Sequence, residues 1–191
     1  MTNKKGDIIG AAIHRIAMQG DSFSAAQIAA DVGCSQSLLF RYYGTKDGLM
    51  SACFDTVCHE LMGVLRGVEV PGRPDIEKVN RYIIRVWEAY CGYLGSNSHM
   101  ARAYLFFVGR GMRFPKGYRN AGGVLRRMLG DDYHSIVSIY PDFGFIAEYM
   151  IMFSYAAATG LFVVHDMDSD DILNKVERIL KHGICGYGRD R

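Results

Sequence analysis

The side chains best suited to chemistry lie in residues 24–43, SAAQIAADVGCSQSLLFRYY. The spacing of the apolar residues predicts two short helices joined by a glycine turn, with small polar residues at the tip of the second helix. Polar groups in that position could reach the edges of DNA bases. The segment therefore has the pattern of a helix-turn-helix DNA reader. The alternative interpretation is a plain helical hairpin whose polar face meets only water.

Local capping signals support both helices. Ser24 starts an S-x-x-Q capping box, and Ser35 is a good cap for the second helix. Gly33 tolerates the positive φ at which the first helix would stop. Leu39 and Tyr43 are four residues apart and can both turn inward as anchors. The side chains left on the outside are then Gln36, Ser37, Arg41 and Tyr42.

Helical periodicity continues on both sides of this segment. Upstream, apolar residues from Ile8 to Ala17 form a helical stripe that ends near Gly20. Downstream, Thr45 can cap a helix from about Lys46 to Arg66. The expected inner face of that helix is Leu49, Phe54, Val57, Leu61 and Leu65.

Here the chain resembles the TetR family of transcriptional regulators. The residues that match, at that family's spacing, are Ile28, Ala29, Gly33, Ser35, Leu39, Tyr43, Lys46 and Leu49. The resemblance covers about the first sixty residues. It implies an all-α protein with a three-helix helix-turn-helix DNA-binding domain at 4–64. A larger helical domain at 65–191 would bind an effector and dimerise.

The resemblance also implies that the second helix of the motif enters the major groove of DNA. Gln36, Ser37 and Arg41 would then read bases, because glutamine pairs with adenine and arginine with guanine or a phosphate. Lys46 would add its charge to the positive end of the helix that it begins. The expected phosphate contacts are Ser24, Tyr42 and Lys46, and Ser35 completes the expected DNA-binding set.

Two positions depart from the family pattern. Phe40 stands where a tyrosine is usual, so one hydroxyl contact to the DNA backbone is expected to be absent. Cys34 stands where a valine is usual, and a buried thiol packs like a small hydrophobe. Oxidation of Cys34 could disturb docking of the second helix, which would make it a redox switch. A structural cysteine is the favoured interpretation.

Composition fits a helical protein of the reducing cytoplasm. Residues 1–49 contain five Lys or Arg and four Asp or Glu, so charge supports DNA binding only weakly. The five cysteines are an odd number at scattered positions and do not suggest a disulfide framework. We expect no signal peptide at the N-terminus, because a helical face starts at once.

The rest of the chain also reads as helical. Gly and Pro in the segment 67–74, GVEVPGRP, are expected to end one helix and change the direction of the chain. Beyond it no long stretch alternates like a strand. The expected caps are Asp75, Asn97 or Ser98, and Ser169. Helices are predicted near 75–95, 98–111, 117–130, 142–165 and 169–186.

The apolar segment 143–164 has 22 residues and a single charge, Glu148, so it is long enough to cross a bilayer. That charge would be costly in a membrane, and no strong basic flank fixes an orientation. We therefore favour a helix buried partly against a second subunit, with no membrane as partner. The expected dimerisation residues are Ala156, Ala157, Gly160, Leu161, Val176 and Ile179.

The middle of the chain is rich in aromatic residues and methionine, which suit an adaptable apolar pocket. The candidate ligand-binding group is Trp87, Tyr90, Phe107 and Tyr149. Ordinary core packing is the alternative for each of these residues. Signals for catalysis, a cofactor or a metal are weak, since the chain has no Gly-rich phosphate loop, no HExxH and no CxxC.

The sequence thus predicts a dimeric, ligand-responsive repressor that binds double-stranded operator DNA and is released by a small-molecule effector. We expect it to be cytoplasmic and not an enzyme. Two alternatives remain open at this point. One is a small membrane-anchored protein that uses 143–164, and the other is a small-molecule-binding helical enzyme or carrier.

Overall fold

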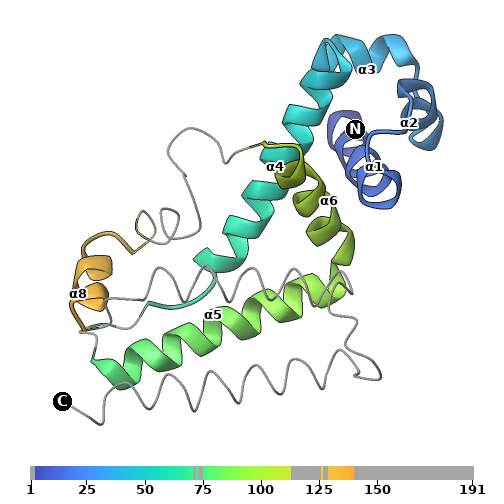
Figure 1. Ribbon diagram of the computed structural model, residues 1–191. Helices are drawn as coiled ribbons and strands as arrows, with labels where there is room; N and C mark the ends of the chain where they lie inside the picture. Colours follow the sequence, from blue (N-terminus) through green and yellow to red (C-terminus); the bar gives the residue numbers. More distant parts are fainter. Residues whose placement is uncertain (1–2, 71, 73–74, 113–125, 127–128, 140–191) are drawn as a thin grey trace, which may run out of the picture. The chain divides into compact units, whose positions relative to one another are not determined.

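The computed structural model describes residues 3–70, 72, 75–112, 126 and 129–139 (Figure 1). In this part of the chain the regular structure is entirely helical, which confirms the predicted all-α class. The helices predicted at 142–165 and 169–186 lie outside the described residues, as do Ser169 and most of the helix predicted near 117–130. The elements, as labelled in Figure 1, are α1 (Lys4–Gln19), α2 (Ala25–Asp31), α3 (Gln36–Tyr43), α4 (Lys46–Arg66), α5 (Ile76–Ser96), α6 (Ser98–Gly109) and α8 (Asp131–Ile139).

The chain folds into two compact units. The first consists of Met1–Leu61 and Asn97–Arg113, and the second of Met62–Ser96 and Phe114–Arg191. The first unit thus contains α1, α2, α3, most of α4, and α6. The sequence did not predict that α6 joins the helix-turn-helix unit. The proposed domain division between residues 64 and 65 stays a prediction.

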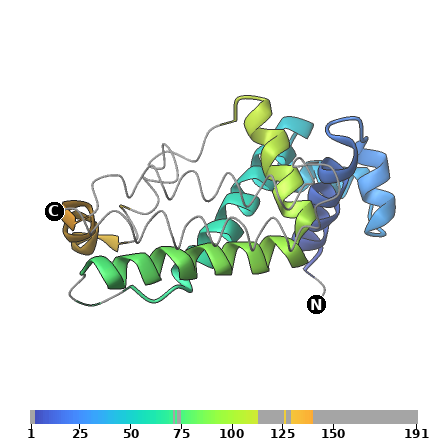
Figure 2. The same cartoon turned by 60° about the horizontal axis from the view of Figure 1, so that its bottom comes forward.

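The core of the first unit forms where α1 packs along α6 (Figure 2). As expected, α1 ends at Gly20, whose φ of 65° is in the left-handed region. A side chain there would also be crowded, since a Cβ on Gly20 would lie 3.0 Å from the ring of Phe106 in α6. The residues that α1 buries are Ile8, Ala12, Ile13 and Ile16.

Helix α4 begins and ends where the sequence predicts. The backbone N–H of Gly48 donates to the hydroxyl of Thr45 over 3.0 Å, so Thr45 caps the helix as expected. The predicted inner face is confirmed, because every member is at most 3% exposed: Leu49, Phe54, Val57, Leu61 and Leu65.

In the second unit, α5 starts at the predicted cap. The N–H of Lys78 donates to the carboxylate of Asp75 over 2.8 Å. Helix α6 follows Asn97, whose side chain makes no capping hydrogen bond to that helix.

Helix α8 was not predicted. It follows Gly130, which has a φ of 53°, and it carries Asp131 and Asp132 in its first turn. Two acidic residues there stabilise the positive end of a helix. With nine residues, α8 is too short to show a clear periodic stripe.

Candidate DNA-binding surface

The first helix of the motif and its turn have the predicted geometry. In α2 the N–H of Gln27 donates to the hydroxyl of Ser24 over 3.3 Å, and the N–H of Ser24 donates to the amide oxygen of Gln27 over 2.8 Å. These two bonds form a complete capping box. Gly33 follows with a φ of 60°, and the next N–H, of Cys34, donates to the carbonyl of Ala29. The turn therefore uses the glycine as the sequence predicts.

Helix α3 presents an outer edge, which we define as Gln36, Ser37, Arg41 and Tyr42. The hydroxyl of Ser35 accepts a hydrogen bond of 3.2 Å from the N–H of Leu38 and caps the helix. Leu39 is fully buried on the inner side. All four side chains of the outer edge are exposed, and Tyr42 is 40% exposed. Figure 1 shows α3 at the periphery of its unit, between α2 and α4. Ser24 and Ser35 are exposed as well.

The last residue of α3 holds this helix on α1. Tyr43 is half-buried, and its hydroxyl donates to the backbone carbonyl of Lys5 over 2.7 Å. Burial is the main cause that raises the pKa of Tyr43 to about 12, so the phenol remains a protonated donor at neutral pH. Tyr43 therefore anchors the helix, as predicted, and does so through a hydrogen bond as well as by packing.

Lys46 has a structural contact that the sequence did not reveal. Its ammonium group donates to the carbonyl of Asp21 over 2.5 Å and to that of Phe23 over 2.9 Å. It also lies 4.5 Å from the centre of the Phe23 ring, which is a cation–π distance. Lys46 thus ties the start of α4 to the turn between α1 and α2. Its expected contact with a DNA phosphate stays a prediction.

Two acidic residues of this unit, Asp21 and Asp31, are paired with cations other than Arg41. Arg15 donates two hydrogen bonds, of 2.5 and 2.7 Å, to the carboxylate of Asp31. This contact holds the pKa of Asp31 below its usual value. Asp21 forms an ion pair with Arg110, which directly follows α6. Arg41 has no acidic partner within the described residues, and its guanidinium lies 5.8 Å from the Tyr42 ring. The charge of Arg41 is therefore available to a ligand outside the chain.

Phe40 is 40% exposed, next to Arg41 on the same helix. The TetR family usually has a tyrosine at this position. In this chain the exposed ring has no hydroxyl. An exposed aromatic ring of this kind can contact the methyl group of thymine.

The predicted effector residues fall in different parts of the chain. Trp87 and Tyr90 are each 4% exposed on α5, in the second unit. Phe107 is fully buried in the first unit, with its ring centre 5.3 Å from that of Phe54. Tyr149 and all six predicted dimerisation residues lie outside the described residues. The effector site and the dimer interface stay predictions.

Two buried thiols are relevant to the alternative in which the protein is an enzyme, because a thiolate could act as a nucleophile. Burial raises the pKa of both Cys53 and Cys58 to about 12. Such thiols remain protonated at neutral pH and are poor nucleophiles.

In the described part of the chain, no helix has both the length and the apolar character needed to cross a membrane. The segment 143–164 lies outside it.

Solved structures identify the fold. A TetR-like transcriptional regulator from Rhodococcus sp. RHA1 superimposes with a TM-score of 0.65 at 20% identity, covering 96% of both chains. A tetR-family regulatory protein from Rhodococcus RHA1 gives 0.69 at 15% identity, covering 96% of this chain and 98% of the other. A TetR-family regulator from Marinobacter aquaeolei VT8 gives 0.61 at 17% identity, covering 92% and 94%. No protein-family model and no curated protein matches the chain. The chain has the TetR-family fold, as predicted.

Proposed function

We propose that this protein is a homodimeric transcriptional repressor of the TetR type, which binds double-stranded operator DNA and is released by a small-molecule effector. The observation that carries the proposal is the division of α3 into two sides. Leu39 is fully buried on one side, while Gln36 and Arg41 are exposed on the other. A helix anchored in this way can be placed in a major groove without unfolding its own core.

The outer edge of α3 carries groups suited to base edges. The amide of Gln36 can pair with adenine, and the guanidinium of Arg41 can pair with guanine or hold a phosphate. The hydroxyls of Ser24, Ser35 and Tyr42 are exposed and can donate to phosphates. Phosphate contacts position a protein, whereas base contacts give sequence preference. We assign base reading to Gln36, Ser37 and Arg41.

A dimer would match the symmetry of an operator. Two copies of α3 related by a twofold axis meet two half-sites of a near-palindrome, one helical turn of DNA or a multiple of it apart. The proposed interface is a four-helix bundle made of the segments near 142–165 and 169–186 from each subunit. Close approach of the helices would rely on the small residues Ala156, Ala157 and Gly160.

Release by an effector requires two arrangements of the subunit with different affinities for DNA. An effector shifts the equilibrium only by its differential affinity for the two states. Helix α4 is the proposed lever, because its residues belong to the first unit through Leu61 and to the second from Met62. The proposed effector contacts are Trp87, Tyr90, Phe107 and Tyr149, and the proposed place of action is the cytoplasm.

The test is a selection of DNA fragments from the source genome with the purified full-length protein. We expect a small set of fragments to be enriched, sharing a near-palindromic sequence whose half-sites are spaced by about one helical turn or a multiple. A selection that enriches no shared sequence at low salt would contradict the proposal.

A further inference from the structure

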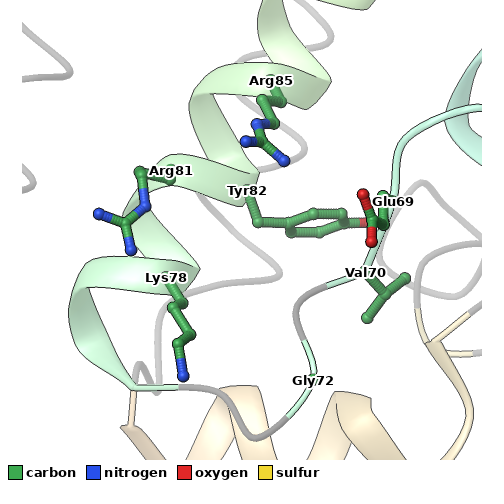
Figure 3. Close-up of a pocket in the computed structure, with 7 residues that line it drawn as sticks. All are labelled: Glu69, Val70, Gly72, Lys78, Arg81, Tyr82 and Arg85. Atoms are coloured by element: carbon green, nitrogen blue, oxygen red, sulfur yellow. The ribbon is translucent and has the colours of Figure 1, made fainter.

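A second site lies at the start of α5, inside the second unit (Figure 3). It is a cavity of about 220 Å³ between the connection that precedes α5 and the first turns of that helix. It opens to solvent and has room for a small organic molecule. Its walls are formed by Glu69, Val70, Gly72, Lys78, Arg81, Tyr82 and Arg85.

Three cationic side chains from one helix line this cavity. Lys78, Arg81 and Arg85 are spaced by three and four residues, which places them on one face of α5. Figure 3 shows these three side chains on successive turns of α5. The face is thus built to attract a negatively charged group.

The cations differ in how far they are already neutralised. Lys78 pairs with Asp75 over 3.2 Å, with both side chains at least 40% exposed. Arg81 pairs with Glu77, and both of these side chains are more than half exposed. Exposed pairs contribute little to stability, so they oppose the binding of another carboxylate only weakly. Arg85 makes no hydrogen bond or ion pair to any described residue.

The opposite wall carries an acceptor. Figure 3 shows the ring of Tyr82 extending from α5 toward Glu69. Tyr82 is 2% exposed, so its ring gives the cavity a fixed apolar wall. The carboxylate of Glu69 would repel a simple anion, but it would accept a hydrogen bond from a hydroxyl or amino group. The two walls therefore suit a ligand with an acid at one end and a donor at the other.

We propose that this cavity binds a small hydroxy acid or amino acid. Arg81 and Arg85 hold its carboxylate, Lys78 adds charge, and Glu69 accepts from its hydroxyl or ammonium group. Planar guanidinium groups match a carboxylate with paired hydrogen bonds. This site is distinct from the aromatic residues proposed for the effector, and it does not depend on DNA binding.

The experiment is a calorimetric titration of the full-length protein with D-glycerate and with L-serine, each compared with propionate, which lacks the donor. We expect saturable binding of at least one donor-bearing acid and at least tenfold weaker binding of propionate. Arg85→Gln should weaken the donor-bearing acid about tenfold or more, as loss of a charge-assisted contact requires. Arg102→Gln is the control, because Arg102 is an exposed arginine of α6 in the other unit and should leave binding unchanged.

Glu69→Leu tests the acceptor wall separately from the cationic wall. It should weaken binding of the donor-bearing acid, because the acceptor is lost, and strengthen binding of propionate, because the repulsive charge is lost. As a measurement free of substitutions at the site, the side-chain Nε–H signal of Arg85 in the ¹⁵N-arginine NMR spectrum should shift on titration. Absence of saturable binding for both probes would overturn the proposal. So would equal losses in Arg85→Gln and Arg102→Gln, or stronger binding of every acid by Glu69→Leu.

Discussion

The hydroxyl of Tyr43, at the end of α3, donates a hydrogen bond of 2.7 Å to the carbonyl of Lys5 in α1. The two residues are 38 positions apart in the chain. Together with the cap at Ser35 and the buried Leu39, this bond fixes α3 at its start, middle and end. The direction in which Gln36 and Arg41 point is therefore set by contacts on the opposite side of the helix.

Tyr43→Phe is expected to lower the free energy of unfolding by about 1 kcal/mol, because one hydrogen bond is lost while the ring still packs. Chemical denaturation at pH 7 measures the change. Burial raises the pKa of Tyr43 from its ordinary value of 10.0 to about 12. The stability that depends on the protonated phenol is thus complete below pH 10 and is lost as the pH rises toward 12. The wild type should lose more stability than Tyr43→Phe over this interval, and equal losses would exclude this role.

Lys46→Gln is expected to lower the free energy of unfolding by about 1–2 kcal/mol. This is near the lower end of the range for hydrogen bonds made by charged groups, because the Lys46 side chain is half exposed. The cause is loss of the two bonds to the carbonyls of Asp21 and Phe23. Lys5→Gln is the matched control, since Lys5 is exposed and should change stability little. Equal stability of the two variants in urea would show that Lys46 does not hold the turn.

The same pair of variants tests the predicted phosphate contact of Lys46. If Lys46 also neutralises a phosphate, Lys46→Gln should reduce the slope of log affinity against log salt by about one. The measurement is a DNA titration at several salt concentrations with a selected fragment. An unchanged slope would restrict Lys46 to its structural contact.

Thiol labelling should distinguish the cysteines of the first unit. Cys53 and Cys58 are fully buried, and the pKa of each is raised to about 12, so their thiolates are scarce at pH 8. Cys34 is half-buried at the turn between α2 and α3. Iodoacetamide at pH 8 should modify Cys34 well before the other two, as read by mass spectrometry of peptides. Labelling of all three at one rate in the folded protein would contradict the described core.

Ala157→Arg is expected to split the proposed dimer, because it would bury an unpaired charge at the interface. Sedimentation velocity of the wild type and the variant at equal concentration gives the result. An intact dimer in the variant would count against an interface at this residue.

Much of the helix-turn-helix could be predicted because its signals are local. The capping box of Ser24, the positive φ of Gly33 and the cap at Ser35 each depend on residues no more than about four positions away. The buried face of α4 likewise follows from a regular spacing.

Other features depend on distant partners and leave little trace in a single sequence. Helix α6 packs on α1 in the first unit, with the Phe106 ring close to Gly20. Nothing in the sequence near either residue indicates the other. A lysine near a reading helix is equally suited to binding a phosphate and to holding the fold. The sequence alone therefore could not reveal the structural contact of Lys46. Its carbonyl partners lie 23 and 25 residues away. The cationic face of α5 does not indicate a site in the sequence alone, because its cavity forms only when Glu69 and Gly72 lie beside it.

The central claim is that the outer edge of α3 binds DNA, and a titration of one selected genomic fragment tests it most directly. Arg41→Ala should weaken binding by about 1–3 kcal/mol if Arg41 reads a base, while Arg102→Ala, on α6, should bind like the wild type. Helical circular dichroism of both variants must match the wild type. If Arg41→Ala combined with Gln36→Ala binds the fragment as tightly as the wild type, α3 is not the reading helix.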